Sequence, residues 1–250
     1  MRRNKKGKTV PQDLFVFLVL GLLAAVLAAV VHLLYHAEFA ETATPNDCFA
    51  APASARATGE TAVPKVVCLT FDDGPHPYYT ELLLDGLAER RVKATFFLLG
   101  ANIEGREDVV KRMAEEGHLI GNHTYYHVDI NSLTEAEACR EITETGRLIA
   151  EITGQPVEYI RPPYGNWNKS LECDVIMLPV FWSLDTLDWK LKNTEQIVKK
   201  VLGEVEENDV ILMHDSYATS VEAALRIVDE LKAQGIEIVD TKDGASWKRV

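Results

Sequence analysis

Two adjacent carboxylates, Asp72 and Asp73, end a run of strand-forming residues in the stretch LTFDDGP, residues 69–75. Like charges placed side by side repel each other, and a tight turn needs only one of the two residues. A positive group beside them would remove the repulsion, and a bound metal ion is one such group. The pair therefore predicts a charged site where this strand ends.

A pair of histidines supplies a second part of such a site. His123 and His127, in GNHTYYH, are four residues apart, so on one helical turn they would share a face and could bind one divalent cation. By itself this spacing also fits ordinary surface or core histidines. Two histidines with one carboxylate form a common open metal site. We expect one residue of the Asp72–Asp73 pair to be the third ligand and the other to accept a proton from water.

Proton donation to a leaving group needs a further residue. His214, in ILMHDS, can supply the proton if a carboxylate orients its ring, and both Asp185 and Asp188 of DTLDW are candidates. Arg161 of RPPYG is the candidate counter-charge for the carboxylate that acts as base. Each of these residues has a purely structural explanation by itself. Their joint occurrence indicates hydrolytic chemistry.

Alternating apolar runs and helix-period stretches, from residue 64 onward, must position these groups. This alternation predicts βα units and a parallel α/β sheet of about seven strands, either open or closed into a barrel. The predicted strands are Val66–Phe71, Ala94–Leu99, His118–Gly121, Glu158–Arg161, Val180–Leu184, Val210–Met213 and Glu237–Val239. The predicted helices are Thr80–Arg90, Asp108–Glu116, Thr134–Thr153, Thr194–Val205 and Val221–Gln234. The polar clusters all follow predicted strands, and the carboxyl ends of parallel strands share one edge, so we expect them to converge.

The N-terminal part has a different composition. Residues 1–13 are basic, and residues 14–37 are apolar without Asp, Glu, Lys or Arg, which predicts a cytoplasmic segment followed by a transmembrane anchor. A cleaved signal sequence is the alternative, since AEFAETA at 37–43 could be cut. Residues 38–63 are typical of a flexible linker, which leaves 64–250 as the domain. We expect a single-pass cell-membrane protein with an extracytoplasmic domain, or a secreted protein if the segment is cleaved.

Net charge and cysteine content limit the partners and the cross-links. The net charge of −12 argues against a nucleic acid partner, which would require a basic face. An exported chain could pair its cysteines, but Cys48, Cys68, Cys139 and Cys173 allow three connectivities and the sequence selects none. Cys68 lies in a predicted buried strand, where a thiol acts as a small apolar side chain.

The polar clusters, taken in order, resemble those of a known family. The chain is similar over about residues 64–240 to the polysaccharide deacetylases of the NodB-homology group, carbohydrate esterase family 4. Five ordered motifs carry the resemblance and are far more specific together than any one alone. They are TFDDG at 70–74, HTYYH at 123–127, RPPYG at 161–165, DTLDW at 185–189 and LMH at 212–214.

This resemblance implies a distorted (β/α) barrel with fewer than eight complete repeats and metal-dependent removal of acetyl groups from N-acetylated sugars. By position, Asp72 would be the general base, held by Arg161. Asp73, His123 and His127 would bind the metal, usually zinc and sometimes cobalt or another divalent ion.

The resemblance also implies roles around the scissile bond. The backbone N–H of Tyr164 would stabilise the oxyanion, and His214, tuned by Asp188, would be the general acid. The substrate pocket would be lined by Pro162, Tyr164, Trp189 and Leu212. A fixed N–H and an acid agree with what amide hydrolysis requires, because a tetrahedral oxyanion forms and the departing amine needs a proton.

The leading functional hypothesis is an anchored enzyme that deacetylates N-acetylglucosamine of peptidoglycan, because an anchor and a flexible linker would hold the domain beside the cell wall. A chitin-oligosaccharide deacetylase and an O-acetyl-xylan esterase are alternatives that the motifs do not separate. A glycan-binding module without turnover is an alternative of another class. Every expected catalytic position carries the residue type that catalysis requires, which argues against a binding module without turnover.

Overall fold

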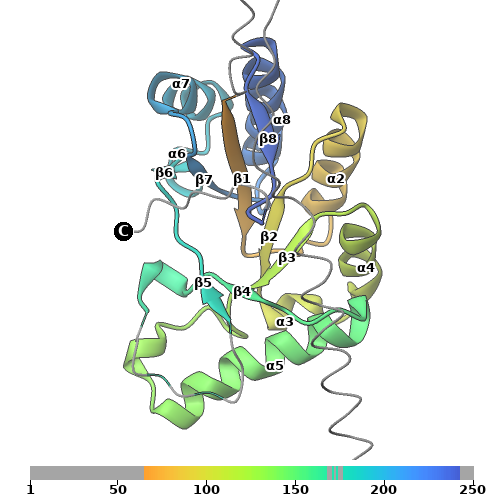
Figure 1. Cartoon of the computed structure of the whole chain (residues 1–250), viewed down its shortest axis with the longest axis vertical. Coiled ribbons are helices and arrows are strands. Elements are labelled where there is room, and N and C mark those ends of the chain that lie inside the picture. Colours follow the sequence, from red (N-terminus) through yellow and green to blue (C-terminus); the bar gives the residue numbers. More distant parts are fainter. Residues whose placement is uncertain (1–64, 168–170, 172, 174–176, 243–250) are drawn as a thin grey trace, which may run out of the picture. The chain divides into compact units, whose positions relative to one another are not determined.

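The structure, a computed structural model, describes residues 65–167, 171, 173 and 177–242 (Figure 1). The predicted basic segment, membrane anchor and linker lie outside these residues. Within the described residues, no helix has the length and apolar character needed to cross a bilayer. The structure therefore bears on the C-terminal domain and its site.

One sheet with only parallel pairings forms the centre of this domain. Its strand order is β5-β4-β3-β2-β1-β7-β6, and β8 pairs with the first half of β1. The sheet curls into a half-barrel (Figure 1), which confirms the predicted parallel, barrel-like α/β fold. The strands are β1 (Val66–Asp72), β2 (Thr95–Leu98), β3 (Leu119–Asn122), β4 (Tyr159–Ile160), β5 (Leu178–Pro179), β6 (Leu184–Asp185), β7 (Val210–His214) and β8 (Glu237–Val239).

The predicted strand Val180–Leu184 is wrong, because this stretch crosses between the two edges of the sheet. At one edge β4 pairs with β5, and directly after this pairing the N–H of Val180 donates a hydrogen bond to the carbonyl of Ile160 (2.8 Å). On the other side the N–H of Ser183 bonds the carbonyl of Val210 at the start of β7 (3.0 Å). Among the described residues no pairing joins β5 to β6. We call residues 180–183 the seam segment, since the chain itself spans the gap that a closed barrel would fill with a strand pair.

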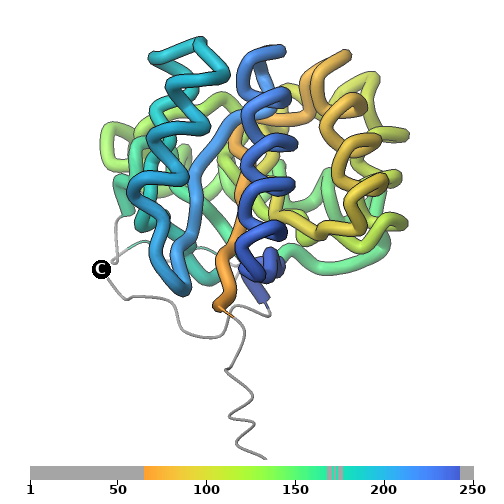
Figure 2. The backbone as a smooth tube through the Cα atoms, turned by 90° about the horizontal axis from the view of Figure 1, so that it is seen from above, coloured from red at the N-terminus to blue at the C-terminus, as the bar shows by residue number. Residues whose placement is uncertain are grey.

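Helices cover the outside of the curled sheet. The five long predicted helices are confirmed with small shifts at their ends, whereas two short ones, α3 and α6, were not predicted. Helices α7, α8 and α2 lie side by side (Figure 2). The helices are α2 (Tyr79–Arg90), α3 (Gly100–Ile103), α4 (Glu107–Glu115), α5 (Glu135–Thr153), α6 (Asp188–Leu191), α7 (Thr194–Glu204) and α8 (Ala218–Ala233), and two 3₁₀ turns are η1 (Ile130–Ser132) and η2 (Pro163–Gly165).

Local sequence explains where the longest helix, α5, begins and ends. Thr134 accepts a hydrogen bond from the N–H of Glu137, whose side chain bonds back to Thr134, so the two form a capping box. Gly154 ends the helix with φ of 71°, a left-handed conformation that glycine adopts without a Cβ clash. The position of α5 is thus set by local chemistry at both ends.

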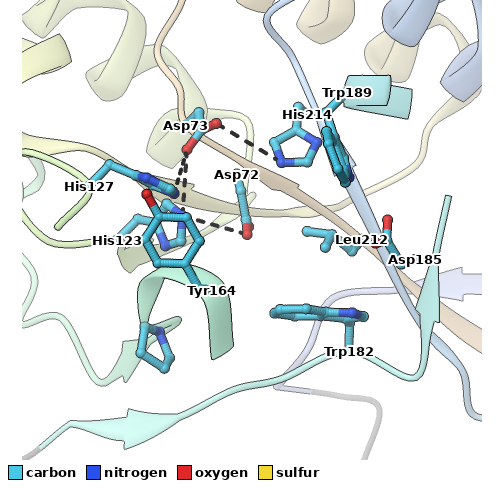
Figure 3. Close-up of a pocket in the computed structure, with 11 residues that line it drawn as sticks. Asp72, Asp73, His123, His127, Tyr164, Trp182, Asp185, Trp189, Leu212 and His214 are labelled. Carbon is cyan, nitrogen blue, oxygen red and sulfur yellow. Dashed lines mark ion pairs between the residues drawn. The ribbon is translucent and has the colours of Figure 1, made fainter. Parts of the chain in front are cut away.

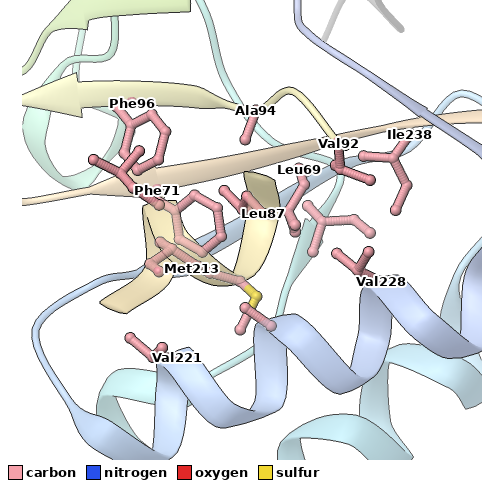
Figure 4. Close-up of a cluster of buried hydrophobic side chains, with 14 of the residues drawn as sticks. Leu69, Phe71, Leu87, Val92, Ala94, Phe96, Met213, Val221, Val228 and Ile238 are labelled. Atoms are coloured by element: carbon pink, nitrogen blue, oxygen red, sulfur yellow. The ribbon is translucent and has the colours of Figure 1, made fainter. Parts of the chain in front are cut away.

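Side-chain alternation along the strands separates the core from the site. Val67, Leu69 and Phe71 of β1 pack in the hydrophobic cluster against the helices (Figure 4). The intervening Thr70 and Asp72 point to the other face, where both contact Arg161. Because successive side chains of a strand point to opposite faces, a chain that buries the helix-facing residues must direct Thr70 and Asp72 into the curled interior.

Candidate active site

The carboxyl ends of the strands surround one cavity of about 340 Å³ (Figure 3). Asp72 ends β1, His214 ends β7 and Asp185 ends β6, while the loops after β3 and β4 supply the other polar groups. This confirms that the polar clusters converge. The cavity is lined by Asp72, Asp73, His123, His127, Pro162, Tyr164, Trp182, Asp185, Trp189, Leu212 and His214.

Three of these side chains form a group suited to a metal ion. Asp73 Oδ1 lies 3.5 Å from His123 Nε2 and 3.6 Å from His127 Nε2, and one ligand atom from each residue lies within 4.8 Å of the others. Asp73 Oδ1 is buried and has no hydrogen-bond partner among the described residues. A buried carboxylate oxygen is costly without a partner, and a divalent cation held with two imidazoles would supply one.

The ring orientations and protonation of the two histidines also fit such an ion. His123 Nδ1 bonds the carbonyl oxygen of Arg161 (2.6 Å), so this nitrogen carries the proton and Nε2 faces Asp73 with its lone pair. Burial and the neighbouring His123 imidazole lower the pKa of His127. His127 is therefore neutral at pH 7, which is the form that binds metals.

The two histidines do not share a helical turn, which corrects the geometry expected from their spacing. They lie in the loop after β3, where Thr124 and His127 have φ values of 68° and 56°. Asp73, with φ of 72°, is likewise left-handed, and Asn102 of α3 donates a hydrogen bond to its carbonyl (2.7 Å). Residues other than glycine rarely adopt this conformation, so the surrounding contacts must hold Asp73 and His127 in place.

Asp72 lies beside this group and contacts the buried Arg161. Arg161 Nη1 donates to Asp72 Oδ1 (2.8 Å), and both side chains are almost inaccessible to solvent. The other oxygen, Oδ2, is 3.8 Å from His123 Nε2. Asp72 is thus directed toward the candidate metal group, with the counter-charge that the sequence predicted.

Arg161 also bonds the seam segment, which the sequence did not predict. Its Nε and Nη2 donate to the carbonyl oxygens of Val180 (3.2 Å) and Phe181 (3.1 Å), and its Nη1 donates to Thr70 Oγ1 (2.7 Å). The guanidinium carbon lies 4.3 Å from the ring centre of Phe97. Because Arg has five donors in a rigid fork, this residue can hold Asp72 and the seam segment together.

His214 lies beside the other carboxylate oxygen of Asp73, away from the two histidines, with its Nε2 4.0 Å from Asp73 Oδ2 (Figure 3). Its Nδ1 bonds Asp188 Oδ1 (2.8 Å), and its backbone N–H donates to Asp188 Oδ2 (2.9 Å). Burial favours neutral His214, but the hydrogen bond and charge of Asp188 outweigh it and, with Asp72 and Asp73, raise the pKa of His214 to about 9. His214 is therefore protonated at neutral pH.

The structure separates the roles of the two candidate orienting carboxylates. Asp188 is fully buried and contacts His214, whereas Asp185 Oδ1 accepts a hydrogen bond from the N–H of Leu187 (2.8 Å). Leu187 has φ of 56° and directly precedes α6. Asp185 thus stabilises the turn that positions Asp188 beside His214, and Asp185 also lines the cavity.

The remaining predicted pocket residues lie at the mouth and the wall of the cavity. The side chains of Tyr164 and Trp189 are 65% and 48% exposed, so they form its rim, whereas Leu212 is buried. Tyr164, with φ of 60°, lies in η2, whose hydrogen bonds are donated by Gly165 and Asn166, so its N–H takes no part in the turn's own bonding.

Two residues near the site were missed. Trp182, in the seam segment, lines the cavity, and its place between two motifs was the only signal in the sequence. Asp215 follows His214 and is fully buried, with Oδ2 bonded to the hydroxyl of Thr80. Burial raises the pKa of Asp215 to about 7. A Cβ on Gly74 would approach Asp215 Oδ2 to 2.8 Å, so this acid packs under the turn that follows Asp73.

A disulfide joins Cys139 of α5 to Cys173, a pairing that the sequence left open. The thiol of Cys68 donates to the carbonyl of Asp240 (3.4 Å) within the buried sheet. Cys48 lies outside the described residues. The cross-link thus attaches Cys173 to α5, the helix that packs against β3 and so lies beside the loop that carries His123 and His127.

Comparisons with known proteins agree with these motifs. The family model for polysaccharide deacetylase matches residues 59–176. The peptidoglycan-N-acetylmuramic acid deacetylase PdaC of Bacillus subtilis is 38% identical over 70% of this chain, and its solved structure superposes with a TM-score of 0.70, covering 72% of this chain and 90% of that one. The match spans only 38% of the length of PdaC, so this chain corresponds to part of that protein.

Two further relatives have other named activities. A peptidoglycan-N-acetylglucosamine deacetylase of Bacillus cereus is 41% identical over 69% of this chain and 66% of its own length. A chitooligosaccharide deacetylase of Rhizobium leguminosarum is 42% identical over 60% of this chain and 71% of its own. With five ordered motifs gathered around one cavity, the chain belongs to the polysaccharide deacetylase family of hydrolases, the NodB-homology group.

Proposed function

We propose that this protein hydrolyses the N-acetyl group of N-acetylglucosamine in peptidoglycan and releases acetate. The observation that carries the proposal is the placement of two separately supported groups around Asp73. Asp72 with its counter-charge Arg161, and protonated His214 with Asp188, both lie next to the candidate metal group. A base and an acid beside a candidate metal group are what hydrolysis of an unreactive amide requires.

The candidate metal would be bound by Asp73, His123 and His127, with zinc as the first candidate and cobalt or another divalent ion as alternatives. When bound, it would supply positive charge that polarises the acetyl carbonyl and makes water more acidic. Asp72 accepts a proton from the attacking water, and Arg161 holds the carboxylate in place. The Tyr164 N–H donates to the oxyanion that develops on the acetyl group.

His214 completes the reaction at the leaving group. Its Nε2–H donates a proton to the sugar nitrogen as the carbon–nitrogen bond breaks, and the products are acetate and a free amine. Asp188 holds the ring by Nδ1 and stabilises its charged form. Leu212 and the indoles of Trp189 and Trp182 line the space beside the acetyl methyl, which disfavours larger acyl groups.

The choice of peptidoglycan is supported by the two peptidoglycan deacetylases among the relatives. It is also supported by the predicted N-terminal anchor, which would hold the domain at the outer face of the cell membrane, beside the wall. Chitin oligosaccharides are the second candidate substrate, favoured by the chitooligosaccharide relative. N-terminal sequencing of the membrane-bound protein would distinguish an intact anchor from a cleaved signal. Recovery of only a soluble, cleaved form would contradict anchoring.

The proposed activity is tested by acetate release from the full-length protein. The protein is stripped of metal, reloaded with zinc or cobalt, and offered peptidoglycan, chitin oligomers and acetylated xylan. We expect release that requires metal and is fastest from peptidoglycan, with Asp72→Asn as a variant that binds metal and does not turn over. Faster release from chitin oligomers would reassign the substrate.

Two other outcomes of that assay would contradict the proposal itself. Glycan binding without acetate release by the metal-loaded protein would favour a binding module. Release from xylan alone would favour an esterase, and His214→Ala would then leave most of the activity, because an ester's leaving alkoxide needs less help than an amine.

A further inference from the structure

One side chain of α5 holds the loop that carries the two histidines. Glu141 Oε2 accepts hydrogen bonds from the backbone N–H groups of Tyr125 (2.9 Å) and Tyr126 (2.8 Å). These two residues directly precede His127, a member of the candidate metal group. A single carboxylate oxygen therefore fixes the peptide groups that lead into one metal ligand.

The loop needs such support because its backbone is unfavourable. Thr124 and His127, on either side of the two tyrosines, are both left-handed, and Thr124 is also β-branched. Backbone contacts hold the beginning of the loop, since the N–H of Gly100 bonds the carbonyl of Thr124 and the N–H of Ala101 bonds that of Tyr125 (both 3.0 Å). The contacts of Glu141 act closer to His127.

The position of Glu141 is itself well fixed. Cys139, two residues earlier on α5, is in the disulfide with Cys173. The carbonyl of Ile142, one residue later, accepts a hydrogen bond from Asn122 Nδ2 (2.7 Å), and Asn122 ends β3. Because α5 is attached to other elements on both sides of Glu141, the carboxylate of Glu141 has a fixed position and can fix the position of the loop.

We propose that Glu141 is a positioning residue of the metal site. By accepting the two N–H groups it keeps His127 Nε2 close to Asp73 and His123, and so increases metal affinity without binding the ion. Residues that orient metal ligands from outside the coordination sphere typically change metal affinity by roughly 10–100-fold when mutated. This inference rests on the proposed metal-dependent function.

The test is a cobalt titration of the metal-free full-length protein, followed by visible absorption and repeated as zinc competition with a chromophoric chelator. Glu141→Ala should weaken both affinities by about 10-fold or more. Glu141→Gln keeps an oxygen that can accept the same hydrogen bonds and should stay close to wild type. Glu144→Ala is the matched control, because Glu144 is an acidic residue of the same helix that pairs with Arg147 and should leave affinity unchanged.

Each departure from this pattern has a definite meaning. Wild-type affinity in Glu141→Ala would overturn the proposal, and an equal loss in Glu141→Gln would assign the effect to charge rather than to hydrogen bonding and would also overturn it. If Glu141→Ala does not fold, Glu141→Asp keeps the charge with a shorter reach and should still lose affinity, so unchanged affinity there would refute the inference. Failure of the wild type to bind either metal would instead contradict the proposed function.

Discussion

Asp72 and His214 are register partners on the neighbouring strands β1 and β7. Paired residues of adjacent strands direct their side chains to the same face of a sheet, so the proposed base and acid flank the same cavity. Each has its own buried partner, Arg161 for Asp72 and Asp188 for His214. Removing either residue therefore leaves the buried partner of the other in place, although Asp72 also contributes to the raised pKa of His214.

Mutation should distinguish the roles of the two adjacent carboxylates, Asp72 and Asp73. Asp72→Asn removes the base and should lower kcat by about 100-fold or more, while cobalt absorption shows the metal still bound. Asp73→Asn should weaken cobalt binding itself, because it changes the carboxylate shared with His123 and His127. Loss of the metal in Asp72→Asn would show that the division of roles within the pair is wrong.

The pH dependence of kcat should report His214. Because its pKa is raised to about 9, the proton-donating form persists through neutral pH and is lost as pH rises through about 9. Asp188→Asn removes the strongest of the interactions that raise this pKa, while burial still lowers it, so the alkaline decline should move to lower pH. Asp185→Asn, which keeps an oxygen that can accept the hydrogen bond from the N–H of Leu187, should leave the decline in place. An unchanged decline in Asp188→Asn would exclude His214 as the acid.

Arg161→Met should destabilise the fold, because it leaves Asp72 buried without its counter-charge. Breaking a buried ion pair on one side typically costs about 3–5 kcal/mol. The free energy of unfolding, measured in urea, should fall by this order, and adding Asp72→Asn should recover part of the loss. If the double variant is no more stable than Arg161→Met, the bonds from Arg161 to Val180 and Phe181 carry its stabilising role instead.

Reduction of the Cys139–Cys173 disulfide should lower the free energy of unfolding. The bridged residues are 34 apart, and loop-closure entropy for such a loop corresponds to about 3–4 kcal/mol. Urea unfolding with and without a reducing agent measures the difference. The double variant Cys139→Ser, Cys173→Ser should match the reduced protein and should not respond to the reductant, and a response there would point to another cysteine.

Leu212→Ala should broaden the acyl groups that are accepted, because it enlarges the buried wall of the cavity. One methylene in such a pocket typically changes selectivity by about 10–200-fold. The ratio of propionate to acetate released from matched N-acylated chitin oligomers should therefore rise. Leu69→Ala, on the helix-facing side of β1, should leave the ratio unchanged although it lowers stability. Equal ratios in both variants would place the acyl group elsewhere.

Most of the predicted site residues gather around one cavity because they follow strands. A parallel sheet brings the residues after β1, β3, β4, β6 and β7 to one edge whatever the exact ends of the strands. The choice between Asp185 and Asp188 needed the structure, because both lie in one short motif and only the left-handed turn at Leu187 decides which reaches His214.

The errors arose where one-dimensional patterns do not determine pairing. Spacing alone suggested a helical turn for His123 and His127, but the loop is shaped by contacts from α5, which begins after both of them. The apolar stretch 180–184 is typical of a strand, and no residue pattern within it indicates that it connects two different edges of the sheet. The partner of Cys139 depended on the path of the chain between β4 and β5.

The seam segment has a consequence for how new specificities arise on this scaffold. Trp182 faces the cavity from a short crossing rather than from a paired strand, so its side chain has no register partner on a neighbouring strand with which it must pack. Substitutions there can reshape the wall beside the acyl group, while Arg161 continues to hold the neighbouring carbonyls. Selection for other acyl or sugar groups thus has a position to vary that is not itself a reacting residue, and whose ring contacts the residue that holds the base, Arg161, with 5.8 Å from the guanidinium carbon to the ring centre.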